Sequence, residues 1–181
     1  MKGIVFTEFI DLVEEHFDPD VADRMITAAE LPGGGAYTSV GTYPHAELVR
    51  MVVALGQITG VPLGDLIALF GGHLAKRFKQ LFPAFFAEQP DLFSFLASID
   101  SHIHIEVRKL YPDAELPSFP VESRDAQRMT LLYRSQRCFE DLAEGLILGC
   151  ARQYGESVRL RRETLDGQGT RFVIERDAAA H

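Results

Sequence analysis

The chain is short of positive charge. Its 181 residues include 18 Lys and Arg against 26 Asp and Glu, so the formal net charge is -8. A protein that binds a nucleic-acid backbone needs a surplus of Lys and Arg to neutralise phosphates, so nucleic acid is a poor candidate partner. Hydrophobic residues make up 46% and charged residues 24%, as in a folded protein with a sizeable core. The length fits a single domain over residues 1–181.

Cysteine and long apolar runs are also scarce. Cys138 and Cys150 are the only cysteines, and neither belongs to a CxxC or CxxxH cluster, which argues against a structural zinc site. We expect both to be unpaired, buried thiols. No run of about 18 apolar residues is present to span a membrane. The start, Met1–Phe6, soon meets acidic residues, unlike a signal peptide. These absences predict a cytoplasmic protein without a membrane span.

Motifs of the common enzyme classes are missing as well. The sequence contains no Gly-x-Ser-x-Gly nucleophile motif, no His-Glu-x-x-His zinc motif and no glycine-rich phosphate loop. The chain is therefore predicted to be a binding protein and not an enzyme.

Hydrophobic periodicity predicts helices in the first two thirds of the chain. Helices are expected over residues 1–17, 20–30, 44–60, 62–83 and 91–110, with a loop at the glycine-rich residues 32–35. The pair Gly71–Gly72 falls inside the fourth helix, where each glycine costs about 1 kcal/mol relative to alanine. The pair marks either a bend, which could act as a hinge, or a place where another segment presses close to the backbone.

The last third of the chain predicts a small sheet. Residues 127–133 read as a strand, 139–154 as a helix, and 157–165 with 171–175 as a hairpin around 166–169. The fold class is therefore α+β, with a helical N-terminal subdomain and a C-terminal subdomain that combines a small antiparallel sheet with helices.

His102 and His104 flank one apolar stripe. On a helix, residues two positions apart differ by about 200° around the axis, so the two imidazoles could not share a metal ion. On a strand they would point to the same side, as in the His-x-His metal sites of hydrolases. The helical pattern of residues 91–110 favours the first alternative without deciding the matter. Either histidine could be an axial metal ligand or an ordinary packing residue.

Tyr133, Ser135 and Arg137 follow one another at alternate positions. If the chain is extended there, their polar groups point to one side. Arg137 can hold a carboxylate through two parallel hydrogen bonds, and the two hydroxyl groups can donate one each. The triplet indicates an anion clamp, and the alternative is a solvated strand face. A clamp together with an axial histidine suits a flat cofactor that carries a metal and two carboxylates, such as haem.

Over nearly its full length the chain resembles the haem-nitric oxide/oxygen binding (H-NOX) family, whose bacterial stand-alone members are related to the haem domain of soluble guanylate cyclase. The resemblance rests on the start Met1–Val5, on the His104 helix that ends in Tyr111–Pro112, and on a Tyr-x-Ser-x-Arg signature at residues 133–137. It implies a haem b cofactor buried between the two subdomains, with His104 as the proximal iron ligand.

The resemblance also implies roles for residues around the ring. Tyr133, Ser135 and Arg137 would hold the haem propionates, and Pro117 would pack against the porphyrin. Nitric oxide would weaken the bond between iron and His104 and thereby free the His104 helix. The output would pass in trans to a separate signalling partner, either a histidine kinase of a two-component system or a cyclic-di-GMP enzyme.

Gas selectivity follows from the residues that the resemblance places in the distal pocket, namely Val5, Phe9, Leu74 and Leu142. Leu142 stands where oxygen-binding relatives have a tyrosine. None of the four side chains can donate a hydrogen bond. Bound O2 needs such a donor, whereas NO and CO bind ferrous haem well without one. We therefore expect a sensor that binds NO and CO and excludes O2. The alternative is a haem-free interaction domain that binds a partner or a carboxylate ligand through the clamp.

Overall fold

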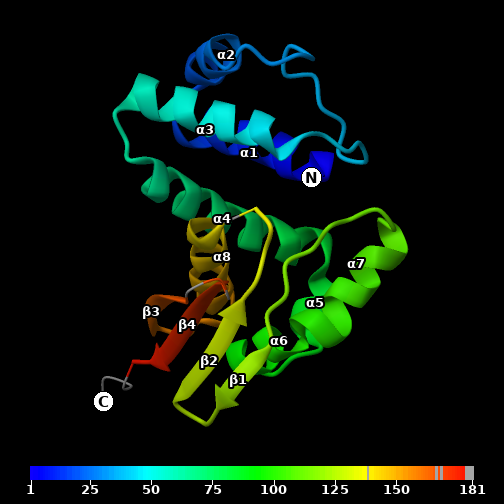
Figure 1. Cartoon of the computed structure of the whole chain (residues 1–181), viewed down its shortest axis with the longest axis vertical. Helices are drawn as coiled ribbons and strands as arrows, with labels where there is room; N and C mark the ends of the chain where they lie inside the picture. Colours follow the sequence, from blue (N-terminus) through cyan, green and yellow to red (C-terminus); the bar gives the residue numbers. More distant parts are fainter. Residues whose placement is uncertain (138, 166, 168, 178–181) are drawn as a thin grey trace. The chain divides into compact units, whose positions relative to one another are not determined.

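The structure is a computed structural model that describes residues 1–137, 139–165, 167 and 169–177. The chain divides into two compact units, Met1–Phe70 and Gly71–His181 (Figure 1). Regular structure in the first unit is helical, and the second unit combines helices with a sheet, so the predicted α+β class is confirmed. One domain over residues 1–181 stays a prediction. Among the described residues, no single helix is long and apolar enough to cross a membrane, and the helices His45–Thr59 and Leu63–Leu81 pass that test only together, as a bent pair.

The first unit packs its helices around aromatic and aliphatic side chains. Phe9 is fully buried and meets the Phe70 ring edge-on, with 5.0 Å between the centroids. The Asp18 carboxylate caps the second helix by accepting the backbone N–H of Val21 at 2.8 Å. Residues 32–35 lie in turns, as expected. The four helices expected here are confirmed, with the bounds α1 (Gly3–His16), α2 (Pro19–Ala28), α3 (His45–Thr59) and α4 (Leu63–Leu81), the last of which extends into the second unit.

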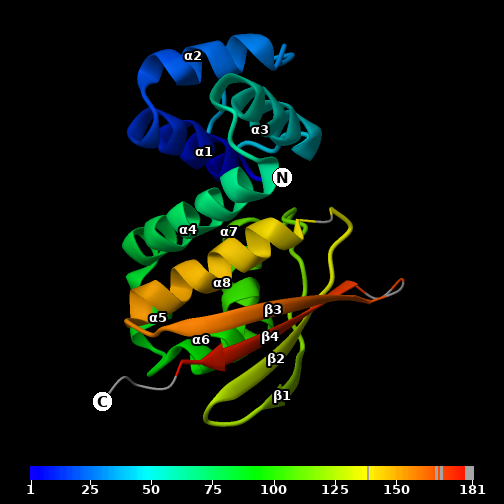
Figure 2. The ribbon, with the colours of Figure 1, turned by 90° about the vertical axis from the view of Figure 1, so that its left-hand side faces the viewer.

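The second unit is built on a four-stranded antiparallel sheet with the strand order β1-β2-β4-β3. Met129 and Leu131 of β2 and Phe172 of β4 are fully buried in one cluster with Ile147 of α8. Figure 2 shows α8 beside the sheet. Helix α4 runs along the side of α8 that faces away from the sheet. The expected strand, helix and hairpin are confirmed, and β1 was not expected. The bounds are β1 (Val121–Arg124), β2 (Arg128–Tyr133), α8 (Glu140–Tyr154), β3 (Val158–Leu165) and β4 (Gly169–Arg176).

The helix expected over 91–110 is interrupted by a π turn. Asp91 caps its start by accepting the Ser94 N–H at 2.7 Å, and α7 begins at His104, directly after the π turn. Because a π turn adds a residue to one helical turn, it rotates all later side chains about the axis, and a pattern of period 3.6 does not reveal it. The bounds in this region, including a short helix that was not expected, are α5 (Pro83–Ala87), α6 (Leu92–Ser98), η1 (Ile99–Ile103) and α7 (His104–Leu110).

Cys150 is a free thiol on α8 and is buried, which raises its pKa to about 12. A thiol in this state is unreactive, because the thiolate is the nucleophile. Cys138 and residues 166 and 168 of the expected hairpin turn lie outside the described residues.

Gly71 lies where α4 and α8 approach at backbone distance. A Cβ atom at this position would stand 2.6 Å from the nitrogen of Leu146 and 2.7 Å from the carbonyl oxygen of Leu142. A Cβ atom at Gly72 would instead meet the flexible end of Arg152, with 2.5 Å to Nη2. The alternative that another segment presses on the glycine pair is thus confirmed for Gly71, and the hinge stays a prediction.

We expect Gly71→Ala to destabilise the protein by about 1–3 kcal/mol, because the α8 backbone must shift to admit the methyl group. Gly72→Ala is the matched control. It should be neutral or stabilise by up to about 1 kcal/mol, since alanine favours the helix and Arg152 can swing aside. Denaturant unfolding of both variants measures the difference. Equal effects of the two substitutions would contradict the close approach at Gly71.

Candidate cofactor site

The His104 imidazole is held at one nitrogen and has little exposure. Its side chain is 12% exposed, and Nδ1 lies 3.1 Å from a carboxylate oxygen of Asp100, one helical turn earlier. Burial lowers the pKa of the imidazole, against the opposing effect of the Asp100 charge. The neutral ring therefore donates its Nδ1–H to Asp100 and keeps a lone pair on Nε2. No hydrogen bond to Nε2 occurs among the described residues, so this nitrogen is the one that can bind a metal.

His102 has a different partner and a different environment. Its Nε2 lies 3.0 Å from a carboxylate oxygen of Glu88, and its side chain is 42% exposed. The helical alternative for the two histidines is confirmed, and the strand alternative is wrong. Within the part of the chain that the structure describes, no three His, Cys, Asp or Glu side chains are grouped to hold a metal ion. A metal bound by His104 would therefore need ligands other than these side chains, such as the nitrogens of a porphyrin.

Asp100 connects the His104 ring to a loop of the same unit. One of its carboxylate oxygens contacts His104, and the other accepts the backbone N–H of Phe119 at 2.7 Å. A carboxylate in this position fixes the tautomer and the orientation of a metal-binding histidine. Phe119 lies two residues after Pro117, so Asp100 positions both the histidine and the Pro117 loop. Sequence analysis missed Asp100, although an acid four residues before a histidine on a helix is a signal for contact.

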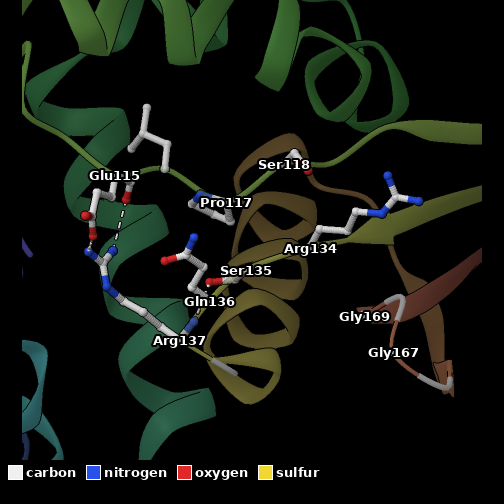
Figure 3. Close-up of a pocket in the computed structure, with 10 residues that line it drawn as sticks. Glu115, Pro117, Ser118, Arg134, Ser135, Gln136, Arg137, Gly167 and Gly169 are labelled. Carbon is white, nitrogen blue, oxygen red and sulfur yellow. Dashed lines mark hydrogen bonds and ion pairs between the residues drawn. The ribbon is translucent and has the colours of Figure 1, made fainter.

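A pocket of about 690 Å³ opens beside Pro117 (Figure 3). Its walls are the loop before β1 and the segment after β2. These two segments pair through backbone hydrogen bonds between Ser118 and Arg134, with N···O distances of 3.0 and 3.1 Å. The volume is typical of a ligand pocket. The lining residues are Glu115, Leu116, Pro117, Ser118, Arg134, Ser135, Gln136, Arg137, Gly167 and Gly169.

The predicted triplet does not continue the strand. β2 ends at Tyr133, and the chain then turns, because the Ser135 hydroxyl oxygen accepts the backbone N–H of Arg137 at 3.1 Å. Ser135 and Arg137 line the pocket. Tyr133 is 3% exposed, and its ring packs against Phe119 with 5.3 Å between the centroids. Its hydroxyl accepts the Phe139 N–H at 3.3 Å. The expectation that all three side chains point to one side of an extended chain is therefore wrong.

Arg137 is paired with a carboxylate at the pocket wall. Its side chain is only 16% exposed. Nη1 donates to the Glu115 carbonyl oxygen at 3.0 Å, and Nη2 donates to the Glu115 carboxylate, as Figure 3 shows. A guanidinium group offers planar donors that match a carboxylate, and a largely buried one needs an anion. A carboxylate therefore fits beside Arg137.

The four residues predicted for the distal pocket lie on helices of both units. Phe9 is fully buried and Val5 is partly buried, both on α1 of the first unit. Leu74 on α4 is 2% exposed, and Leu142 on α8 is partly buried, both in the second unit. All four are apolar, and their assembly into one pocket stays a prediction.

The second unit thus combines two features that fit haem. The His104 Nε2 atom suits an axial position on iron, and the Arg137 guanidinium suits a propionate. An α+β chain with this imidazole nitrogen and this guanidinium has groups that fit a haem-binding domain. Comparison with known proteins gives the family: the model of the Haem-NO-binding family (HNOB) matches residues 2–162, and the chain belongs to this family. The predicted family and its cofactor, haem with iron, are confirmed, and this is a family of gas sensors.

Solved structures of H-NOX proteins are similar to this chain over nearly its whole length. The unliganded Fe(II) protein from K. algicida has a TM-score of 0.92 and 38% identity, and the match covers 100% of this chain and 99% of that one. The Shewanella woodyi protein, in the Fe(II)CO state with IWP-051 bound, has a TM-score of 0.86 and 38% identity over 100% and 97%. The S. oneidensis protein in the Fe(II)NO state has a TM-score of 0.90 and 25% identity over 98% and 100%.

A curated relative is much longer than this chain. The soluble guanylate cyclase gcy-35 of Caenorhabditis elegans is 24% identical over 188 residues. The match covers 96% of this chain and 27% of the cyclase, so the chain spans about a quarter of the length of that relative.

Proposed function

We propose that this chain is a haem-based sensor that binds nitric oxide and CO at ferrous iron, excludes O2, and signals by a conformational change to a separate protein. The observation that carries the proposal is the His104 ring, with Nδ1 held by Asp100 and Nε2 facing no protein partner among the described residues. Relatives in the Fe(II)NO and Fe(II)CO states support the choice of gases.

Each residue of the site has a distinct role in this proposal. His104 would bind the iron, and Arg137 and Ser135 would hold the propionates. Tyr133 supports the turn from within the core, and Pro117 packs against the porphyrin. Two propionate charges in a pocket of low dielectric need charge-assisted donors, which Arg137 provides. Bound haem would supply a ferrous iron that can bind a diatomic gas.

Exclusion of O2 is inferred from a lack of hydrogen-bond donors. None of the predicted distal side chains carries one, and the hydroxyl groups of two tyrosines of the first unit have partners of their own. The Tyr37 hydroxyl donates to the Glu47 carboxylate at 2.7 Å, and the Tyr43 hydroxyl accepts the Thr38 N–H at 3.0 Å. In the second unit, the Tyr154 hydroxyl donates to a backbone carbonyl at 2.9 Å. NO and CO bind without such a donor, so their binding is retained.

The test is the ultraviolet-visible spectrum of the reduced, haem-reconstituted protein without gas, in air and with NO. We expect a Soret band that is unchanged in air and shifts with NO. Leu142→Tyr should add a donor and give a stable spectral change in air. Leu142→Phe, of similar size but without the hydroxyl, is the control and should remain insensitive to air.

Two outcomes would contradict the proposal at different levels. A stable spectral change of the wild-type protein in air would leave the haem site intact and refute the exclusion of O2. Failure to take up haem would refute the sensor itself and favour the haem-free interaction domain.

Signalling is proposed to begin in the segment Ile99–Leu110. Neither η1 nor α7 contains a buried residue, and Ile99 and Ile103 pack only partly buried against the core, so this segment can shift at a smaller cost in core packing than a buried helix. Asp100 joins His104 to the Phe119 backbone, and a displacement of the ring would therefore reach the Pro117 loop. The proposed recipient is a histidine kinase of a two-component system or a cyclic-di-GMP enzyme.

A further inference from the structure

The Arg137 guanidinium, which is proposed to bind a propionate, already binds a carboxylate of the same chain. Nη2 donates to the Glu115 carboxylate, and no other ion-pair partner of Arg137 occurs among the described residues. Glu115 follows α7 by a few residues and lines the pocket beside Arg137 (Figure 3). Sequence analysis gave this glutamate no role, because an acid in a loop is most often a solvated surface residue.

The two partners differ in how firmly they are held. Arg137 is 16% exposed, its backbone N–H is bound by Ser135, and its Nη1 is bound by the Glu115 carbonyl oxygen. The Glu115 side chain is 76% exposed, so water can solvate its carboxylate once it leaves the arginine. When a second carboxylate arrives, the guanidinium therefore stays in place and the glutamate is the group that moves.

We infer that Glu115 is an internal competitor of the haem propionate for Arg137, and that it limits how tightly the pocket retains haem. This inference rests on the proposed role of Arg137 in the function above. The competition has two sources that act in the same direction. Both carboxylates compete for the guanidinium N–H groups that the Glu115 carbonyl oxygen does not use, and a glutamate that remains nearby repels the propionate charge. The backbone contact from Nη1 to the Glu115 carbonyl oxygen survives any substitution of the side chain.

The experiment measures the rate at which the ferric, haem-loaded protein transfers haem to an excess of apomyoglobin. Glu115→Gln keeps the size and the acceptor oxygen of the side chain and removes its charge. Because Glu115 is mostly exposed, the expected effect is that of a surface ion pair, with haem loss up to about fivefold slower than from the wild type. Glu122→Gln is the matched control. It makes the same change of charge on β1, where Glu122 pairs with Arg171, and should transfer haem at the wild-type rate.

A double substitution tests whether the effect runs through Arg137. In an Arg137→Ala background, Glu115→Gln should slow the loss of haem less than it does in the wild type, because the shared arginine is gone and only the repulsion between the two carboxylates is relieved. Glu115→Ala distinguishes two roles of the Glu115 side chain. If Glu115 competes with the propionate, this substitution should also slow haem loss. If Glu115 holds Arg137 in place for the propionate, the substitution should speed haem loss. Haem loss from Glu115→Gln at or above the wild-type rate overturns the inference and leaves the sensor proposal standing. A wild-type protein that takes up no haem overturns both.

Discussion

A His104→Ala variant should show no Soret band of bound haem after reduction, and the band should return when imidazole is added. The wild-type imidazole is 12% exposed, so its removal leaves a cavity of the shape that free imidazole fills. We expect the affinity for haem to fall more than about 100-fold, because loss of an outer partner of a metal ligand alone costs about 10- to 100-fold. Reconstitution with haem, followed by titration with imidazole, measures both the loss and the rescue.

His102→Ala is the matched control for this prediction. The two histidines stand two residues apart on one helical segment, but His102 is 42% exposed and pairs with Glu88. Its removal should leave the spectrum and the haem affinity unchanged. If both variants retained haem, or if His102→Ala lost it and His104→Ala did not, the assignment of the axial ligand would be wrong.

The long helices could be predicted from the sequence because their signals are local. α1, α2, α3 and α8 show apolar residues at helical spacing, and their ends carry glycine, proline or a capping aspartate such as Asp18. The π turn before His104 could not be predicted in the same way, since one inserted residue leaves the average periodicity almost unchanged. β1 was missed because all four of its residues are exposed, so no alternation marks it.

The site was predictable in its residue types and not in its geometry. Ser135 and Arg137 were predicted as an anion clamp and both line the pocket, but the expected strand face is a turn, which the Ser135 hydroxyl stabilises. Asp100 and Glu115 were missed for a related reason. Each acts through a contact with one other residue, Asp100 with His104 and Glu115 with Arg137, and an acidic residue in a sequence carries no mark of its partner.

Arg137→Ala should lose haem to apomyoglobin about 10- to 100-fold faster than the wild type, as expected when a charge-assisted hydrogen bond in a buried site is removed. Arg137→Lys keeps the positive charge without the planar pair of donors, so its rate should fall between those of the wild type and Arg137→Ala. Arg161→Ala is the control and should keep the wild-type rate of haem loss. Arg161 is an exposed arginine on the sheet, and its Nη2 lies 2.9 Å from Oε1 of Glu175.

The loss of Arg137 also releases the Glu115 loop, because both contacts of the guanidinium go to that residue. A structural effect must therefore be separated from the loss of a propionate anchor, and denaturant unfolding of the haem-free variants does so. If Arg137 anchors a propionate, the haem-free Arg137→Ala protein should unfold within about 1 kcal/mol of the wild type, since the Glu115 partner is exposed. Haem loss at the wild-type rate would refute the clamp. Rapid haem loss together with a large loss of stability would assign Arg137 to the loop and leave the propionates to other donors.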